Sequence, residues 1–185
     1  APRYHPAMKH VAGARRRLAK KTIFNILGPL CNPAAPVFQV VGVYRKELMK
    51  KMAGALLRLG SQHALVVCGE DGLDEVTLTG KTHVVELKEG KITEWVLDPV
   101  EHGLEYCKPE ALRGGDADRN ALLLKGVLEG LEGPLRIATV LNAALALLAP
   151  GRALHLAEGI RLAEKSIDTG KAYECLKKFI EVTNR

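Results

Sequence analysis

The sequence predicts an α/β protein in which a mostly parallel sheet is flanked by helices and preceded by a helical segment. Residues 38–43 and 64–68 are short, nearly continuous apolar runs, the pattern of strands buried on both faces. Between them, residues 47–59 place Leu and Met side chains near one face of a helix. A strand–helix–strand unit of this length implies a parallel pair of strands with a right-handed crossover.

The later elements follow from turn residues and apolar patterns. Residues 82–87 and 92–97 alternate or run apolar around a Lys-Glu-Gly-Lys turn, which predicts a hairpin. Asp116 follows two glycines, and we expect it to be the N-cap of the next helix rather than part of a phosphate loop. Gly and Pro divide the last third of the chain into four expected helices, over residues 119–131, 135–148, 154–168 and 172–182. The second of these is apolar nearly all round, which predicts that it is buried.

The amino-terminal end favours helical structure of its own. Its spacing predicts a helix over residues 6–21, with Pro6 in the first turn, and a shorter helix over 23–27 that Gly28 and Pro29 end. The prolines from position 29 onwards make the best candidate linker in the chain.

We therefore expect two units, a helical segment over residues 1–33 and the main part of an α/β domain over residues 34–185. Charge separates them as well. Of the 27 Lys and Arg residues, seven lie in the first unit, which has no Asp or Glu. The second unit has the other 20 basic residues and all 21 acidic residues. Nearly all the surplus positive charge is thus at one end, which indicates an anionic partner or a solvated surface.

A solvated basic face is the simplest explanation of such a charge run, and an ion pair between Arg16 or Arg17 and the second unit is another. Two features favour a binding site instead. The basic residues are mixed with His5, Met8 and His10 rather than with acidic partners one helical turn away. The run also leads into an apolar corner that ends in proline. This combination predicts a pocket for a small aromatic acid, whose carboxylate would meet a guanidinium and whose ring would meet Pro and Met.

Asp74 and Glu75 form a second candidate site. They are adjacent carboxylates in a Gly-flanked loop just after a buried strand, where ligands tend to bind in parallel sheets. Such oxygens suit Mg²⁺, which prefers one or two carboxylates together with water and substrate phosphate. An ordinary acidic surface loop is the alternative explanation.

Composition excludes several classes of protein. No run of 18 or more uncharged apolar residues is present, so we expect no membrane span. The four cysteines are scattered without a CxxC pair, and the histidines lack metal spacing, so neither zinc nor a disulfide framework is indicated. Free thiols favour a cytoplasmic protein. The chain starts without Met, which suggests a fragment or a processed chain.

Several motifs of this chain, in their order, resemble those of anthranilate phosphoribosyltransferases. The resemblance covers nearly the whole chain and rests on residues 1–11, Arg15 and residues 22–33, 39–44, 69–75, 112–116, 141–144 and 167–172.

The resemblance implies the fold of the large domain of nucleoside phosphorylases and phosphoribosyltransferases. It also implies Mg²⁺-dependent transfer of the phosphoribosyl group from phosphoribosyl pyrophosphate to the amine of anthranilate, in tryptophan biosynthesis, by a homodimer. In that family Asp74 and Glu75 would be the Mg²⁺ ligands. Arg15 would engage the anthranilate carboxylate, and His5, Met8 and Pro29 would line the same pocket. Ala19 stands where a Gly is common, so whether Arg15, Arg16 or Arg17 faces the ligand stays open.

The family's glycine-rich phosphate loop would precede Ala1. We therefore expect the 185-residue chain to be inactive alone. Two alternatives remain on the same fold. A relative that binds nucleic acid would use the basic segment, although aromatic stacking residues are scarce near it. A nucleoside phosphorylase is the third option.

Overall fold

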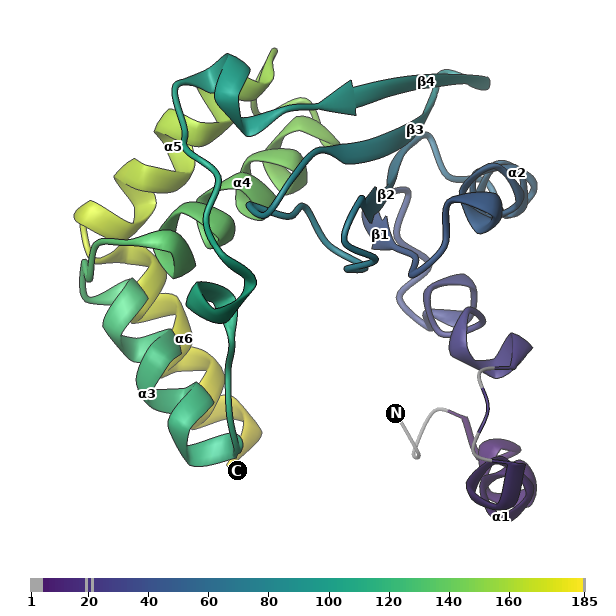
Figure 1. Ribbon diagram of the computed structural model, residues 1–185. Coiled ribbons are helices and arrows are strands. Elements are labelled where there is room, and N and C mark those ends of the chain that lie inside the picture. Colours follow the sequence, from purple (N-terminus) through teal and green to yellow (C-terminus); the bar gives the residue numbers. More distant parts are fainter. Residues whose placement is uncertain (1–4, 19, 21, 185) are drawn as a thin grey trace.

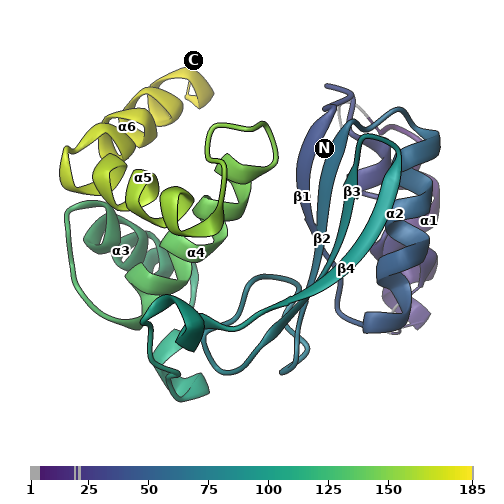
Figure 2. The same ribbon diagram turned by 90° about the horizontal axis from the view of Figure 1, so that it is seen from above.

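The computed structural model describes residues 5–18, 20 and 22–184 and arranges them in layers around one sheet (Figure 1). One helix covers one face of the sheet, and the group of carboxyl-terminal helices lies on the opposite side (Figure 2). The predicted α/β class is confirmed.

The sheet has four strands in the order β1-β2-β3-β4, with bounds Phe38–Gly42, His63–Gly69, Thr82–Lys88 and Lys91–Leu97. β1 and β2 pair in parallel, and β3 and β4 form a hairpin, as the sequence predicted. β2 and β3 pair antiparallel, so this sheet is mixed: only one of its three described pairings is parallel, where a mostly parallel sheet was expected. The hairpin turns through Glu89 and Gly90, whose φ angles are 49° and 77°. So short a connection joins only antiparallel strands.

Helix α2 (Met49–Arg58) covers one face of the sheet. Its buried side chains lie three or four residues apart, on the face that the apolar spacing predicted, and are Met49, Met52, Ala53 and Leu56. They share one core cluster with strand residues that include Val66 and Val85.

Helix α4 (Pro134–Leu148) packs on the other face. Its Leu141 and Leu145 are fully buried in a cluster with Leu65 and Val67 of β2, which confirms the predicted burial of this helix. Helices α3 (Ala117–Leu128) and α5 (Leu156–Asp168) pack against it, and α6 (Lys171–Thr183) packs against both of these. Asp116 caps α3 by accepting the Arg119 N–H at 2.9 Å, as predicted. Within the described ranges, no helix is both long and apolar enough to cross a membrane.

The amino-terminal segment consists of α1 (Met8–Leu18) and two 3₁₀ turns, Ile23–Asn25 and Pro29–Cys31. The expected helix over 6–21 is thus shorter, and the expected helix over 23–27 is a single tight turn. Positions 19 and 21 lie outside the described residues. The effect of Ala19, where a Gly is common, on the direction of the arginines therefore lies outside them too. No residue of α1 is buried. Among the described residues of this segment, Ile26 and Leu30 pack on the core cluster beneath α2.

Candidate functional site

A pocket of about 460 Å³ lies between α1 and the two turns that follow it. Its lining is mostly apolar and consists of His5, Met8, Lys9, Ala12, Arg15, Phe24, Leu27, Gly28 and Cys31. The guanidinium carbon of Arg15 lies 5.8 Å from the centre of the Phe24 ring, within the range of a cation–π contact. The pocket therefore presents a cation against an aromatic and aliphatic wall.

The structure brings together three of the four residues predicted for this pocket: His5, Met8 and Arg15. Arg16 and Arg17 are exposed and do not line it, so of the three adjacent arginines only Arg15 faces this pocket. Pro29 is not among the lining residues either. In its 3₁₀ turn, residues three apart lie on one face, and the turn therefore presents Gly28 and Cys31 instead.

A second pocket, of about 660 Å³, lies between the ends of β1 and β2 and helix α4. Asp74 and Glu75 line it, together with Val40, Gly42, Val67, Leu73, Val76, Leu112, Leu135, Ala138, Thr139 and Asn142. Both carboxylates are exposed. Among the residues that the structure describes, neither has a hydrogen-bond or ion-pair partner for its side chain. Their oxygens are therefore available to a ligand in the pocket.

Gly42, at the end of β1, lets the Asp74–Glu75 turn approach the sheet. A Cβ placed on Gly42 would lie 1.6 Å from the carbonyl oxygen of Asp74 and 2.4 Å from its carbonyl carbon. No side chain fits in that space, so this position requires glycine.

Asp71 organises the loop that leads into the turn. Its Oδ1 accepts the Leu73 N–H at 3.0 Å, and its Oδ2 accepts the hydroxyls of Thr77 and Thr79 at 2.6 and 2.5 Å. Partial burial opposes ionisation, but the hydrogen bonds from Thr77, Thr79 and Leu73 outweigh it, so the pKa of Asp71 lies below its ordinary value. The Asp71 carboxylate therefore holds three residues of the loop together.

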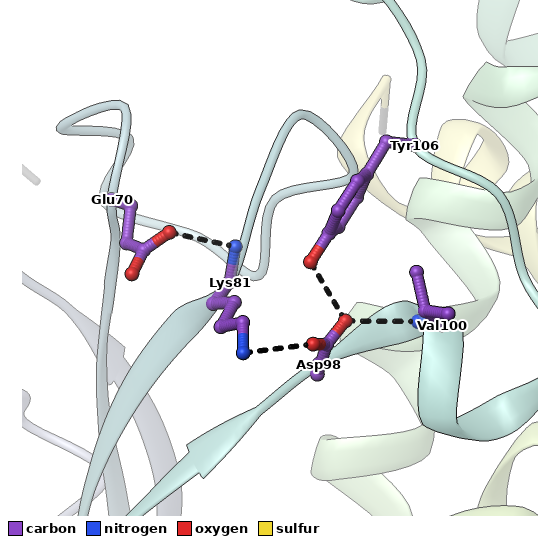
Figure 3. A network of polar contacts seen from close by, with 5 residues as sticks. All are labelled: Glu70, Lys81, Asp98, Val100 and Tyr106. Atoms are coloured by element: carbon purple, nitrogen blue, oxygen red, sulfur yellow. Dashed lines mark hydrogen bonds and ion pairs between the residues drawn. The ribbon is translucent and has the colours of Figure 1, made fainter.

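A second network, around Asp98, ties the same loop to the end of the hairpin (Figure 3). Asp98 accepts the Tyr106 hydroxyl at 2.8 Å and the Val100 N–H at 3.0 Å, and its other oxygen is 3.1 Å from Lys81 Nζ. The hydrogen bond from Tyr106 is the largest cause that lowers the pKa of Asp98. Glu70 accepts the Lys81 N–H at 3.2 Å. Both ends of the loop between β2 and β3 are thereby fixed.

Asn142 of α4 and Asp71 are site residues that the sequence did not single out individually. Asn142 Oδ1 accepts the Val76 N–H at 2.9 Å, and its Nδ2 donates to the Val76 carbonyl oxygen at 3.0 Å. A signal existed for Asn142, since it is a polar residue inside an otherwise apolar helix. Its partner lies 66 residues earlier in the chain, which no local pattern shows.

The donor set at Asp74 and Glu75 fits a weakly enclosed Mg²⁺ rather than a metal held by protein groups alone. The described residues contain no group of three or more His, Cys, Asp or Glu side chains arranged to hold a metal. Two adjacent, unpartnered carboxylates facing an open pocket leave room for water and phosphate oxygens, which Mg²⁺ retains or recruits.

The two pockets share no lining residue. One is formed by α1 and the turns after it, and the other by the sheet and α4. Arg15 and the Asp74–Glu75 turn therefore line separate pockets among the described residues.

Comparison with known proteins gives a consistent result. A family model described as the α/β domain of a glycosyl transferase family matches residues 1–173. An anthranilate phosphoribosyltransferase of Thermoanaerobacter sp. (strain X514) is 50% identical over 185 residues, which are 100% of this chain and 55% of that protein.

Solved structures match as well. The anthranilate phosphoribosyltransferase of Thermus thermophilus has a TM-score of 0.88 and 43% identity, over 98% of this chain and 54% of that one. The Saccharomyces cerevisiae enzyme in complex with PRPP and Mg has a TM-score of 0.89 and 34% identity, over 98% and 52%.

The resemblance read from the motifs is thereby confirmed, and the chain spans about half the length of the curated relatives it matches. With its α/β fold and a family model matched over residues 1–173, this chain belongs to that glycosyl transferase family.

Proposed function

We propose that this chain carries the acceptor pocket and the metal-binding turn of an anthranilate phosphoribosyltransferase. Such an enzyme transfers the phosphoribosyl group from phosphoribosyl pyrophosphate to the amine of anthranilate, and it releases phosphoribosylanthranilate and pyrophosphate in tryptophan biosynthesis. The observation that carries the proposal is the pocket beside α1, where Arg15 stands as a cation against an aromatic and aliphatic wall. This is the chemistry that an aromatic carboxylic acid needs.

In this proposal Arg15 binds the anthranilate carboxylate, and Met8, Phe24 and Leu27 contact its ring. His5 lines the same pocket, and Pro29 supports it through its turn without touching the ligand. Holding the ring by its carboxylate fixes the direction of the neighbouring amine. Such orientation lowers the entropic cost of bringing the amine to the ribose carbon.

Asp74 and Glu75 would hold Mg²⁺ in the second pocket. When bound there, Mg²⁺ would offset the negative charge of the departing pyrophosphate. The protein contributes the position of the two carboxylates, which Gly42, Asp71 and Asn142 determine.

Three further features belong to the proposal. Residues 1–33 act as a helical unit that forms the acceptor pocket, and residues 34–185 form the main part of the α/β domain. The intact protein is a homodimer. No residue of the described α1 is buried, so this helix offers a surface on which a second copy could pack. It works in the cytoplasm, in accord with four free cysteines.

A nucleic-acid-binding function receives less support. A basic strip suited to phosphates would expose Arg15 together with its neighbours. Arg15 instead lines an apolar pocket, whereas Arg16 and Arg17 are exposed. No observation favours this alternative.

A chimera tests the proposal. The portion of the Thermoanaerobacter relative that this chain does not match is fused to residues 1–185, and product formation is measured in the chimera and in the chain alone. We expect activity from the chimera and none from the chain alone. Arg15→Ala should raise the KM for anthranilate by about 10- to 100-fold, since a hydrogen bond to a charged group contributes about 1.5–3 kcal/mol.

Arg17→Ala is the matched control, because it removes the same charge from the same helix without touching the pocket. Its KM should stay within about twofold of the parent, as for an exposed charge. Equal KM changes in the two variants, or a chimera that folds but transfers nothing, would refute the assignment.

A further inference from the structure

Asn142 lies on α4 but makes two of its hydrogen bonds across the second pocket. Its amide oxygen and nitrogen bind the N–H and the carbonyl oxygen of Val76, at 2.9 and 3.0 Å. One side chain thus binds both backbone groups of the residue that directly follows Glu75. The contact spans 66 positions of sequence and joins the turn to a distant helix.

The amide of Asn142 is itself held in place. Its Nδ2 also donates to the Ala138 carbonyl oxygen, one helical turn earlier, at 2.9 Å, which fixes the orientation of the amide plane. The neighbouring Leu141 and Leu145 are fully buried in the cluster against the sheet. Asn142 is therefore a short, oriented side chain on a well-packed helix, the kind of support that fixes a site closely.

The two carboxylates lack support of their own. Asp74 and Glu75 are exposed, and no described residue binds either side chain. Their positions are set through the backbone: Gly42 admits the Asp74 carbonyl, Asp71 holds the Leu73 N–H before the turn, and Asn142 holds Val76 after it. Of these supports, only Asn142 comes from a helix on the far side of the pocket.

We propose that Asn142 is a positioning residue for the Mg²⁺-binding turn, which it fixes by binding both the N–H and the carbonyl oxygen of Val76. The inference rests on the proposed function of Asp74 and Glu75. Residues that orient metal ligands without touching the metal commonly affect metal affinity by about 10- to 100-fold when they are replaced. Asn142 acts on the ligands through the backbone rather than through a hydrogen bond to a carboxylate.

Two measurements on the 185-residue chain test this, with Mg²⁺ alone as the probe. Amide exchange resolved by NMR should show the Val76 N–H exchanging much faster in Asn142→Ala than in the parent. Titration with Mg²⁺, followed by the amide shifts of residues 73–76, should reach its midpoint at about tenfold higher Mg²⁺ in the variant. Asn142→Leu keeps a side chain branched at Cγ but removes its hydrogen bonds, and it should give the same two changes, so the test does not depend on one variant folding.

Asn120→Ala is the matched control. Asn120 binds the N–H and carbonyl oxygen of Gly115, at 2.8 and 3.0 Å, in the same two-bond arrangement but outside the pocket. It should leave the Val76 exchange rate and the Mg²⁺ midpoint unchanged.

The outcomes are distinguishable. If the parent binds Mg²⁺ at residues 73–76 and the Asn142 variants bind it equally well, the positioning role is refuted while the proposed function stands. If Mg²⁺ does not shift these amides in the parent, the metal role of the turn fails, and the inference fails with it.

Discussion

The contact between Gly42 and Asp74 shows how one missing side chain can determine a site. We expect Gly42→Ala to reduce the free energy of unfolding by about 1–3 kcal/mol, because its Cβ would overlap the Asp74 carbonyl and force the turn away from the sheet. Denaturant unfolding of both proteins measures this. Gly54→Ala is the control: it lies in α2, nothing lies within 4 Å of its new Cβ, and alanine should stabilise the helix by about 0.5–1 kcal/mol. Equal effects of the two substitutions would contradict the overlap.

At the same scale, the sequence predicted the chemical types of the site residues better than their supports. Asp74, Glu75 and Arg15 stand out locally, as adjacent carboxylates or as a cation beside an apolar corner. Asn142 does not, because its role depends on a partner 66 residues away. Pro29 was predicted to line the acceptor pocket, but Gly28 and Cys31 line it instead. These two residues lie on the same face of a 3₁₀ turn, and the sequence pattern did not predict that turn.

Elements were predictable wherever a single local pattern decides them. The hairpin, α2 and α4 follow from alternation, from helical spacing and from Gly and Pro. The antiparallel pairing of β2 with β3 was not predictable in this way. The sequence of β2 is a continuous apolar run, and it would look the same whether its second neighbour were parallel or antiparallel. The prediction made the amino-terminal helix too long, at residues 6–21 instead of Met8–Leu18. Sequence spacing shows where a helix can form but does not show where tertiary contacts stop supporting it.

The join between α4 and α5 carries a prediction at the scale of elements. Arg136 of α4 is buried, pairs with Asp168 at the end of α5 at 2.5 Å, and has no described partner for its Nη1. Asp168→Asn should destabilise the protein by about 1–3 kcal/mol, between the values for exposed and buried pairs. The substitution removes the shorter of the two ion pairs of a buried guanidinium and leaves it with Glu132 alone, at 3.6 Å from its Nε. Arg136→Met should cost less, since it removes that buried charge and leaves an aspartate that water reaches. Thermal unfolding of both variants gives the order, and a more damaging Arg136→Met would contradict it.

For the whole molecule, burial falls from the sheet to the amino-terminal segment, and local stability should fall with it. All seven residues of β2 are buried, whereas none of α1 is. Among the described residues of the amino-terminal segment, Ile26 and Leu30 pack on the core. Amides that open without exposing a core need little free energy to exchange.

In hydrogen exchange followed by mass spectrometry, we expect peptides from 8–18 to exchange orders of magnitude faster than peptides from 63–69. Anthranilate should slow exchange in the first group and not in the second, because residues of α1 line the proposed acceptor pocket and residues of β2 do not. Equal protection of α1 and β2 at low protein concentration would contradict this gradient. Protection of α1 that appears only as the concentration rises would instead place α1 in the proposed homodimer interface.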